Sequence, residues 1–187
     1  MIAATKSDRN DIVSMLTEAF ADNKSVNYII ADPGDRKQIK ALMGYSFDVC
    51  EMFGKVFITE DRRGCALLLY PQEKRPTLRG FWLDIKLIFQ AVGILNIGKA
   101  LNRESAIKRL QPGGAMVYLW FIGVSPESQH HGVGSKLMQE IIQMADDQNL
   151  PVLLETSVPE NIGWYSRFGF KTYAELDLSY TLYFLRR

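Results

Sequence analysis

The sequence is poor in cysteine, in histidine and in net charge. Its 187 residues include two cysteines, Cys50 and Cys65, and no CxxC pair, which argues against a secreted disulfide framework. Two free, packed thiols are typical of a reducing compartment, so we expect a cytoplasmic location. The formal net charge is +1, which gives no general attraction to nucleic acid, and we expect no nucleic-acid partner.

A hydrophobic run long enough to span a bilayer is also missing. The most apolar window, residues 80–98, is interrupted by Asp84 and Lys86, and the apolar run after Lys86 is too short to cross a membrane. A buried or interfacial helix is the better interpretation, and we expect no membrane partner. The first eleven residues are too polar for a signal peptide.

The hydrophobic residues that are present amount to 47% of the chain, enough for the core of one domain over residues 1–187. Their periodicity alternates between strand and helix and predicts an α/β sandwich with a mixed sheet. The expected strands lie at about 2–5, 55–60, 65–70, 115–124 and 151–157, with one or two after 170, and the expected helices lie at about 8–21, 35–53, 77–111 (two pieces, broken near Gly93–Gly98), 132–148 and 159–169.

The stretch SPESQHHGVGSKLMQEI, residues 125–141, places a glycine turn between a strand and a helix. Free backbone N–H groups and the positive end of a helix dipole converge at such a turn, which can bind an anion. A dinucleotide fingerprint requires glycine or alanine where Leu137 stands, and a Walker loop requires an upstream spacing that is missing here. On its own, the turn could also be a tight connection that binds nothing.

Two motifs together resemble the GCN5-related N-acetyltransferase (GNAT) superfamily. QHHGVG has the form [Q/R]-x-x-G-x-[G/A] of the acyl-CoA-binding signature, and VPENIGWYSRFGF resembles the second conserved segment, with an Asn four residues before a Tyr and G-F opening the next strand. The resemblance is strong over about 115–175. It implies a mostly antiparallel mixed sheet flanked by helices, with residues 77–111 as a helical insertion between two adjacent strands.

The resemblance also implies roles for individual residues. The backbone of Ile122 and Val124 would pair with the pantetheine arm of acetyl-CoA, Asn161 would hydrogen-bond that arm, and Tyr165 would act as general acid toward the departing thiolate. The alternatives are that Tyr165 is a half-buried core tyrosine and that Asn161 helps to cap the short helix. The pyrophosphate would lie on backbone N–H groups of the loop formed by Gln129, His130, His131, Gly132, Val133, Gly134 and Ser135.

The histidines are therefore expected at the phosphate end of the site and not at the chemistry. A metal site is not expected, because the side chains of two adjacent histidines diverge and no cluster of cysteines or carboxylates accompanies them.

The general base is the open question. Family members often use a Glu on the strand before the glycine loop, which would fall at or near Tyr118, yet no acid occurs between Ala115 and Val124. Glu155 is the main candidate, with a structural carboxylate as its alternative. Glu60 and Asp61 are weaker candidates, and a water chain without a dedicated base is another.

The resemblance implies a cytoplasmic enzyme that moves an acetyl group from acetyl-CoA to an amine, with a small molecule as acceptor, by direct attack in a ternary complex. The alternatives are a non-catalytic acyl-CoA-binding or sensing domain on the same fold, and an α/β interaction protein whose loop binds nothing. The insertion, with Phe81, Trp82 and Phe89, is expected to form an acceptor-site wall or a contact in a homodimer.

Overall fold

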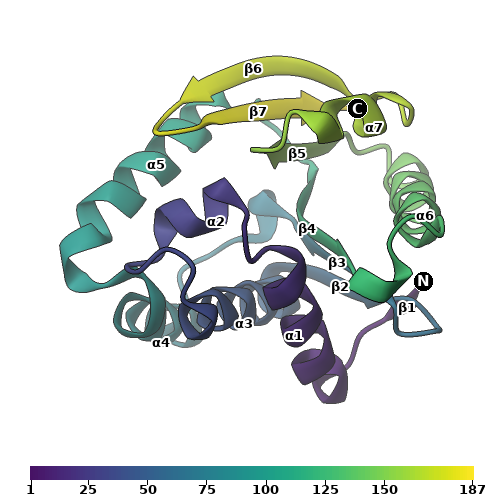
Figure 1. The fold of residues 1–187 in the computed structure, drawn as a ribbon. Coiled ribbons are helices and arrows are strands. Elements are labelled where there is room, and N and C mark those ends of the chain that lie inside the picture. Colours follow the sequence, from purple (N-terminus) through teal and green to yellow (C-terminus); the bar gives the residue numbers. More distant parts are fainter.

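One seven-stranded sheet organises the molecule in a computed structural model that describes residues 1–187 (Figure 1). The strand order is β1-β2-β3-β4-β5-β7-β6, and every neighbouring pair is antiparallel except β4 with β5. The mixed, mostly antiparallel sheet is thus confirmed. The strands are β1 (Ile2–Ala3), β2 (Gly54–Ile58), β3 (Gly64–Leu69), β4 (Val117–Val124), β5 (Val152–Thr156), β6 (Lys171–Asp177) and β7 (Thr181–Arg186).

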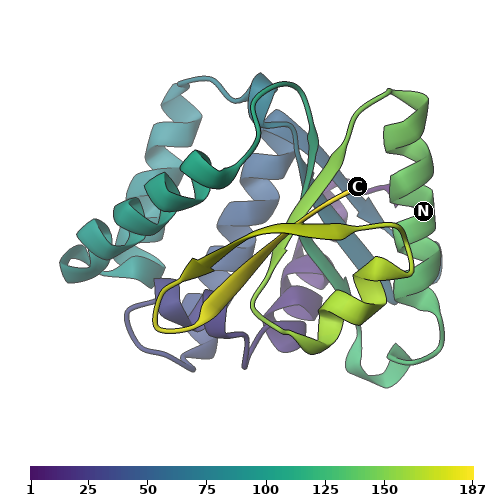
Figure 2. The same ribbon diagram turned by 90° about the horizontal axis from the view of Figure 1, so that it is seen from above.

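Helices cover both faces of this sheet, with α6 on one side and α3 on the other (Figure 2). The α-helices are α1 (Arg9–Ala19), α2 (Lys24–Ile29), α3 (Arg36–Phe53), α4 (Leu78–Leu87), α5 (Ile97–Leu110), α6 (Val133–Asp147) and α7 (Glu160–Ser166). Short 3-10 turns are η1 (Lys6–Asp8), η2 (Pro71–Glu73), η4 (Ile94–Asn96) and η5 (Pro126–Ser128), and η3 (Ile88–Val92) is a π-helical turn.

Each face of the sheet has its own core because the covering helices are amphipathic. Leu16 of α1 and Phe47 of α3 are buried against one face, and Leu137 and Ile141 of α6 are buried against the other. A third, smaller cluster joins Ile107 of α5 to the β6–β7 hairpin. Both cysteines are buried and free, as expected from the sequence.

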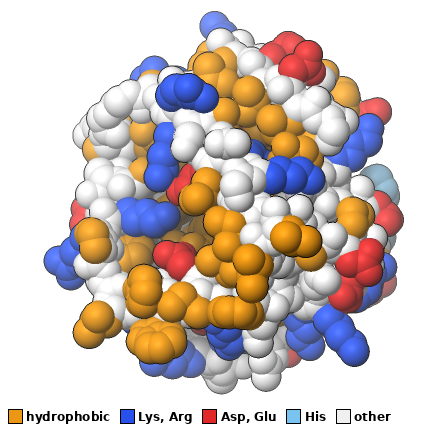
Figure 3. All heavy atoms as spheres, turned by 90° about the vertical axis from the view of Figure 1, so that its left-hand side faces the viewer, with side chains coloured by type: hydrophobic (Ala, Val, Ile, Leu, Met, Phe, Trp, Pro, Cys, Tyr) orange, Lys and Arg blue, Asp and Glu red, His pale blue; other side chains and the backbone are white.

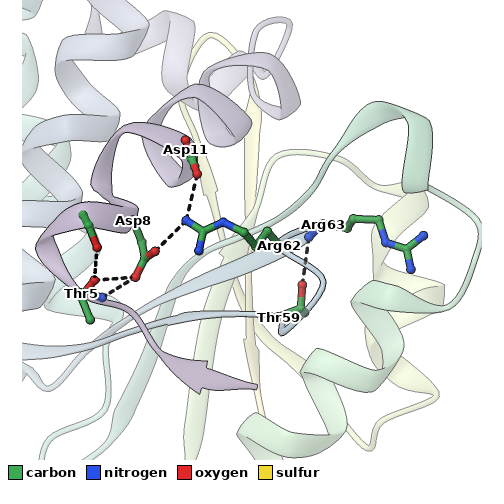
Figure 4. Close-up of polar contacts among 7 residues, drawn as sticks. Thr5, Asp8, Asp11, Thr59, Arg62 and Arg63 are labelled. Atoms are coloured by element: carbon green, nitrogen blue, oxygen red, sulfur yellow. Dashed lines mark hydrogen bonds and ion pairs between the residues drawn. The ribbon is translucent and has the colours of Figure 1, made fainter.

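The first helix, α1, begins at Arg9, within one residue of the expected start. Asp8 occupies its N-cap position, but the Asp8 side chain makes no capping hydrogen bond to α1; its carboxylate accepts hydrogen bonds from Thr5 N (2.7 Å) and Thr5 Oγ1 (2.8 Å) and so closes the 3-10 turn η1. Arg62 of the β2–β3 turn donates to Asp8 (2.6 Å) and to Asp11 (2.9 Å), as Figure 4 shows. These contacts lower the pKa of Asp8 to about 2, the bonds from Thr5 contributing most.

The helix α2 was not expected. It begins after Asn23, whose side chain accepts from Val26 N at 3.1 Å, a cap that stands in the sequence but precedes only six helical residues. Such a short helix carries too little periodicity to be recognised.

The insertion, residues 77–111, is confirmed as helical and lies between the adjacent strands β3 and β4. It breaks at Gly93, whose φ of 74° is the left-handed region that favours glycine. No single helix of the protein is long and apolar enough to cross a membrane. The helical segments Leu78–Val92 and Ile94–Leu110 would together be long and apolar enough to span one, but they are bent by 104° relative to each other.

Strands β4 and β5 separate partway along their length, next to a bulge in β4. Leu67 of β3 pairs with Phe121 but Leu68 pairs with Leu119, so Trp120 is an extra residue, a β-bulge. A bulge bends the strand that carries it. The parallel pairing of β4 with β5 spans only Val117–Leu119, and beyond the bulge residues 121–124 of β4 pair with β3 alone. The sheet therefore opens between β4 and β5.

Candidate active site

A cavity of about 760 Å³ occupies the opening between β4 and β5. The glycine loop and α7 border it toward one end, and α1, α2 and Arg103 of α5 border it toward the other. Its volume falls within the range usual for small-molecule sites. All of the residues expected to form the site line this cavity except His131.

The glycine loop supplies free backbone donors to the cavity. The loop turns through left-handed conformations at His130 (φ 64°) and Gly132 (φ 81°), and Gly132 precedes the first turn of α6. The first N–H of this helix with a backbone acceptor is that of Lys136, which donates to Gly132 O at 3.0 Å. The N–H groups of Val133, Gly134 and Ser135 are therefore available to an anion at the positive end of a fifteen-residue helix.

Gly134 shows how closely a ligand can approach the loop. A Cβ added there would lie 3.5 Å from Val124 Cγ2 and 3.8 Å from Trp164 Cζ2, both on residues that line the cavity. Glycine at this position therefore leaves open the space that a side chain would fill. This cradle fits the phosphates of a coenzyme A ester.

The two histidines have different surroundings. His130 lines the cavity, whereas His131 is placed outside it, with Nδ1 2.8 Å from Gln129 O. Neither is part of a group of three or more histidine, cysteine or acidic side chains that could hold a metal ion.

The edge of β4 that faces β5 forms one wall of the cavity. Ile122 and Val124 lie beyond the last β4–β5 pair, Leu119 with Leu154, so their backbone has a partner only in β3. Backbone groups need hydrogen-bond partners, and an amide-bearing ligand in the opening could supply them, as an added strand does.

Tyr165 and Asn161 come from the short helix α7. Tyr165 is 7% exposed and packs edge-on against Trp164, with ring centroids 4.9 Å apart, while it also lines the cavity. Burial raises the pKa of Tyr165 to about 12, so the phenol is protonated at neutral pH. Asn161 is exposed on the cavity side, and the cap residue of α7 is Pro159, so Asn161 does not cap this helix.

Glu155 lies on β5 beside the position where the family often has its acid. Tyr118 of β4 donates its hydroxyl hydrogen to Glu155 Oε2 at 2.8 Å, and Gln111 Nε2 donates to Glu155 Oε1 at 3.3 Å. Burial raises the pKa of Glu155, opposed by the hydrogen bond from Tyr118 and by the charge of Arg103. A carboxyl group with a raised pKa in a cavity is a candidate proton acceptor.

The other acids considered as bases lie elsewhere. Neither Glu60 nor Asp61 lines the cavity; both belong to the β2–β3 turn. Asp61 accepts hydrogen bonds from Thr59 Oγ1 (2.6 Å) and Arg63 Nε (2.8 Å), and its pKa is lowered to about 2, mainly by the bond from Thr59. Such a carboxylate is a poor base at a distance from the site.

Arg103 was not anticipated as a site residue. It reaches the cavity from the insertion and donates to Ser25 Oγ (2.6 Å) and Tyr180 Oη (3.0 Å). By contrast, Phe81, Trp82 and Phe89 of the insertion do not line the cavity. Sequence spacing cannot show which side chain of a helix will face a distant strand. The remaining walls at this end are largely apolar, formed by Phe20, Val26, Ile29, Leu42, Trp120, Phe121 and Leu182.

An open, mostly antiparallel sheet flanked by helices, which parts over a glycine turn, matches the fold of GNAT acetyltransferases. The chain belongs to the acetyltransferase (GNAT) family, whose sequence profile matches residues 48–170. It is also similar to an uncharacterised N-acetyltransferase of Schizosaccharomyces pombe, with 40% identity over 53 residues. That segment covers 28% of this chain and only 22% of the relative.

Solved structures share the fold over nearly the whole chain. A histone acetyltransferase HPA2 and related acetyltransferase from Corynebacterium glutamicum has a TM-score of 0.71 at 22% identity, covering 98% of this chain and 93% of that one. The C-terminal condensation domain of Ebony, in complex with beta-alanyl-dopamine, has a TM-score of 0.67 at 10% identity (100% and 96% covered). Arylalkylamine N-acetyltransferase 2 from Aedes aegypti has a TM-score of 0.64 at 16% identity (100% and 96% covered).

Proposed function

We propose that the protein transfers an acetyl group from acetyl-CoA to the amine of a small molecule, by direct attack in a ternary complex. The observation that carries this proposal is a single cavity with free helix N–H groups at the glycine loop and with Glu155 and Tyr165 on its walls. Membership of the acetyltransferase family supports acetyl transfer in general. Acetyl-CoA supplies the thioester, and the loop Gln129–Ser135 would hold its phosphates.

The two titratable groups suit opposite ends of the reaction. An amine arrives mostly as an ammonium ion with a pKa near 10, so it must lose a proton before its nitrogen can attack. Glu155 accepts that proton, directly or through a water molecule, and Tyr118 and Gln111 hold the carboxylate in place. Tyr165 then donates a hydrogen bond to the sulfur as the carbon–sulfur bond breaks.

The pKa of Tyr165 sharpens its role. A thiolate has a pKa of about 8.5, well below the value of about 12 for this phenol, so complete proton transfer to sulfur is uphill. Tyr165 therefore acts chiefly as a hydrogen-bond donor to the developing thiolate. The attacking nitrogen loses its second proton to solvent as the amide forms, and the thiolate takes from solvent the proton that completes free CoA. The partly apolar walls around Phe20 and Phe121 favour an acceptor with an apolar or aromatic body.

The test is calorimetric titration with acetyl-CoA, followed by release of free CoA against a panel of amines. We expect binding below millimolar concentration and turnover on amines with an apolar body. Tyr165→Phe should bind acetyl-CoA as the wild type does and lower kcat by roughly 10²- to 10³-fold, the cost of losing one hydrogen-bond donor to a developing anion. No binding of acetyl-CoA would refute the proposal. Binding without turnover on any amine would favour a non-catalytic acyl-CoA-binding domain.

A further inference from the structure

The insertion exposes large apolar side chains that a buried helix would hide. Leu95 is 99% exposed, Leu78 is 83% exposed and Phe89 is 71% exposed. Figure 3 looks onto this side of the molecule and shows apolar side chains gathered in its lower part, over α4 and the turn toward α5. We name this surface the apolar face; its members are Leu78, Phe81, Trp82, Phe89, Ile94, Leu95 and Leu101.

The apolar face is separate from the side of α4 that packs on the protein. Leu83 and Leu87 contact the core, whereas Phe81 and Trp82 stand three and four residues after Leu78 and thus share its side of the helix. The helix is therefore apolar on two sides. A second apolar side exposed on a folded protein marks a contact with something outside it.

The charge around the apolar face identifies the partner. Residues 74–111 contain eight lysines and arginines and two acids, a net charge of +6 in a chain whose total is +1. Both acids are already engaged, because Asp84 accepts from Tyr45 Oη (2.7 Å) and Glu104 pairs with Lys108 (3.0 Å). The exposed cations without a carboxylate within 4.0 Å are Lys74, Arg75, Lys86 and Arg109, together with Lys99, whose Nζ lies 3.8 Å from the centroid of the Tyr28 ring.

A second copy of this surface is a poor partner for it. A two-fold dimer through the apolar face would set the same unpaired cations of each protomer near those of the other, and like charges brought together are unfavourable. An anionic lipid surface matches both features, since its headgroups attract lysine and arginine and its acyl chains accept the apolar side chains.

The shape of the insertion suits a position in the plane of a bilayer. Its two helical pieces meet at 104° at Gly93, so that Ile94 and Leu95 form a projecting corner, and neither piece is long enough to cross a membrane. Tryptophan and phenylalanine beside basic residues are typical of helices that lie at the lipid–water boundary. We propose that the apolar face and its surrounding cations seat the protein on anionic lipid bilayers.

The experiment is co-sedimentation of the full chain with vesicles of phosphatidylcholine alone and of phosphatidylcholine with about one third phosphatidylglycerol. We expect binding to the anionic vesicles, weakened by added salt, and at least about tenfold weaker binding to neutral ones. Phe81→Ser combined with Leu95→Ser should lower binding at least about tenfold, as should Lys74→Gln, Arg75→Gln and Lys86→Gln together.

The matched control is Ile2→Ser, which removes an exposed apolar residue on β1, at the edge of the sheet opposite the β6–β7 hairpin that α5 contacts. It should leave vesicle binding unchanged. Equal or absent binding to both kinds of vesicle would overturn the proposal. It would also be overturned if Phe81→Ser with Leu95→Ser converted a dimer to a monomer in sedimentation velocity and left vesicle binding intact, because the face would then be a contact between copies. Circular dichroism on each variant shows whether a loss of binding reflects unfolding.

Discussion

Gly134 offers a substitution that separates ligand binding from folding. Its backbone is helical, and an added Cβ would make only ordinary van der Waals contacts, at 3.5 Å to Val124 and 3.8 Å to Trp164. Alanine favours a helix over glycine by about 0.5–1 kcal/mol. We therefore expect Gly134→Ala to keep the free energy of unfolding of the ligand-free protein or to raise it slightly.

The same methyl group would stand in the cavity, where the phosphates should come close to the loop. Overpacking a close-fitting site costs about 1–3 kcal/mol. With about 1.4 kcal/mol for each tenfold change, the Kd for acetyl-CoA should rise roughly 5- to 150-fold. Isothermal titration measures the Kd, and urea unfolding measures the stability.

Gly98→Ala is the matched control. Gly98 is the second residue of α5, as Gly134 is the second residue of α6, and nothing lies within 4 Å of a Cβ built on it. The free energy of unfolding of Gly98→Ala should stay the same or rise slightly, as expected for Gly134→Ala, and its Kd for acetyl-CoA should equal that of the wild type. If both variants bind acetyl-CoA as tightly as the wild type, the glycine loop does not hold the phosphates and our assignment of the cofactor site is wrong.

Three further perturbations test other parts of the molecule. Glu155→Gln should lower kcat/KM roughly 10²- to 10⁴-fold. It should also remove the acid-side decrease of the pH–rate profile, which in the wild type lies above the range of an ordinary glutamate because burial raises the pKa of Glu155; an unchanged profile would exclude Glu155 as the base. His130→Ala should weaken acetyl-CoA binding modestly, and His131→Ala should leave it unchanged. Both variants should keep nearly the full kcat at saturating acetyl-CoA. A collapse of kcat in either variant would show that a histidine takes part in the chemical step. Asp8→Asn should reduce the loss of folding stability at acid pH. The pKa of Asp8 is about 2 in the folded protein and near 3.9 in the unfolded chain. The stability that ionised Asp8 contributes is therefore present above pH 4 and is lost between about pH 4 and pH 2. Equal urea midpoints of Asp8→Asn and the wild type across that range would contradict this assignment.

The glycine loop was predictable from sequence because its signal is local. A strand, Gly132, Gly134 and an amphipathic helix follow one another within a few residues, and the structure places that helix at Val133–Asp147. The break of the insertion at Gly93 was predictable for the same reason, since a glycine with a left-handed φ interrupts an otherwise helical pattern. Both features depend on neighbours in the chain.

The acid end of the site depends on distant neighbours, and the sequence shows it only in part. Tyr118 was recognised as the residue at the usual place of the acid, yet its hydrogen bond to Glu155 arises from the alignment of two strands 37 residues apart. The bulge at Trp120, which opens the sheet, has no mark in the sequence because any residue can be the extra one. Arg103 reaches the cavity only because α5 packs beside the β6–β7 hairpin.

The position of the insertion between β3 and β4 has a consequence for how the protein folds. The β2–β3 hairpin closes over residues 59–63, whereas β3 and β4 can pair only after residues 70–116 have been looped out. Closing the longer loop costs about 2 kcal/mol more in chain entropy, unless α4 and α5 form first and shorten it. The pairing of β3 with β4 should therefore follow the formation of the β2–β3 hairpin, and refolding should accelerate in variants that strengthen α5, such as Gly98→Ala.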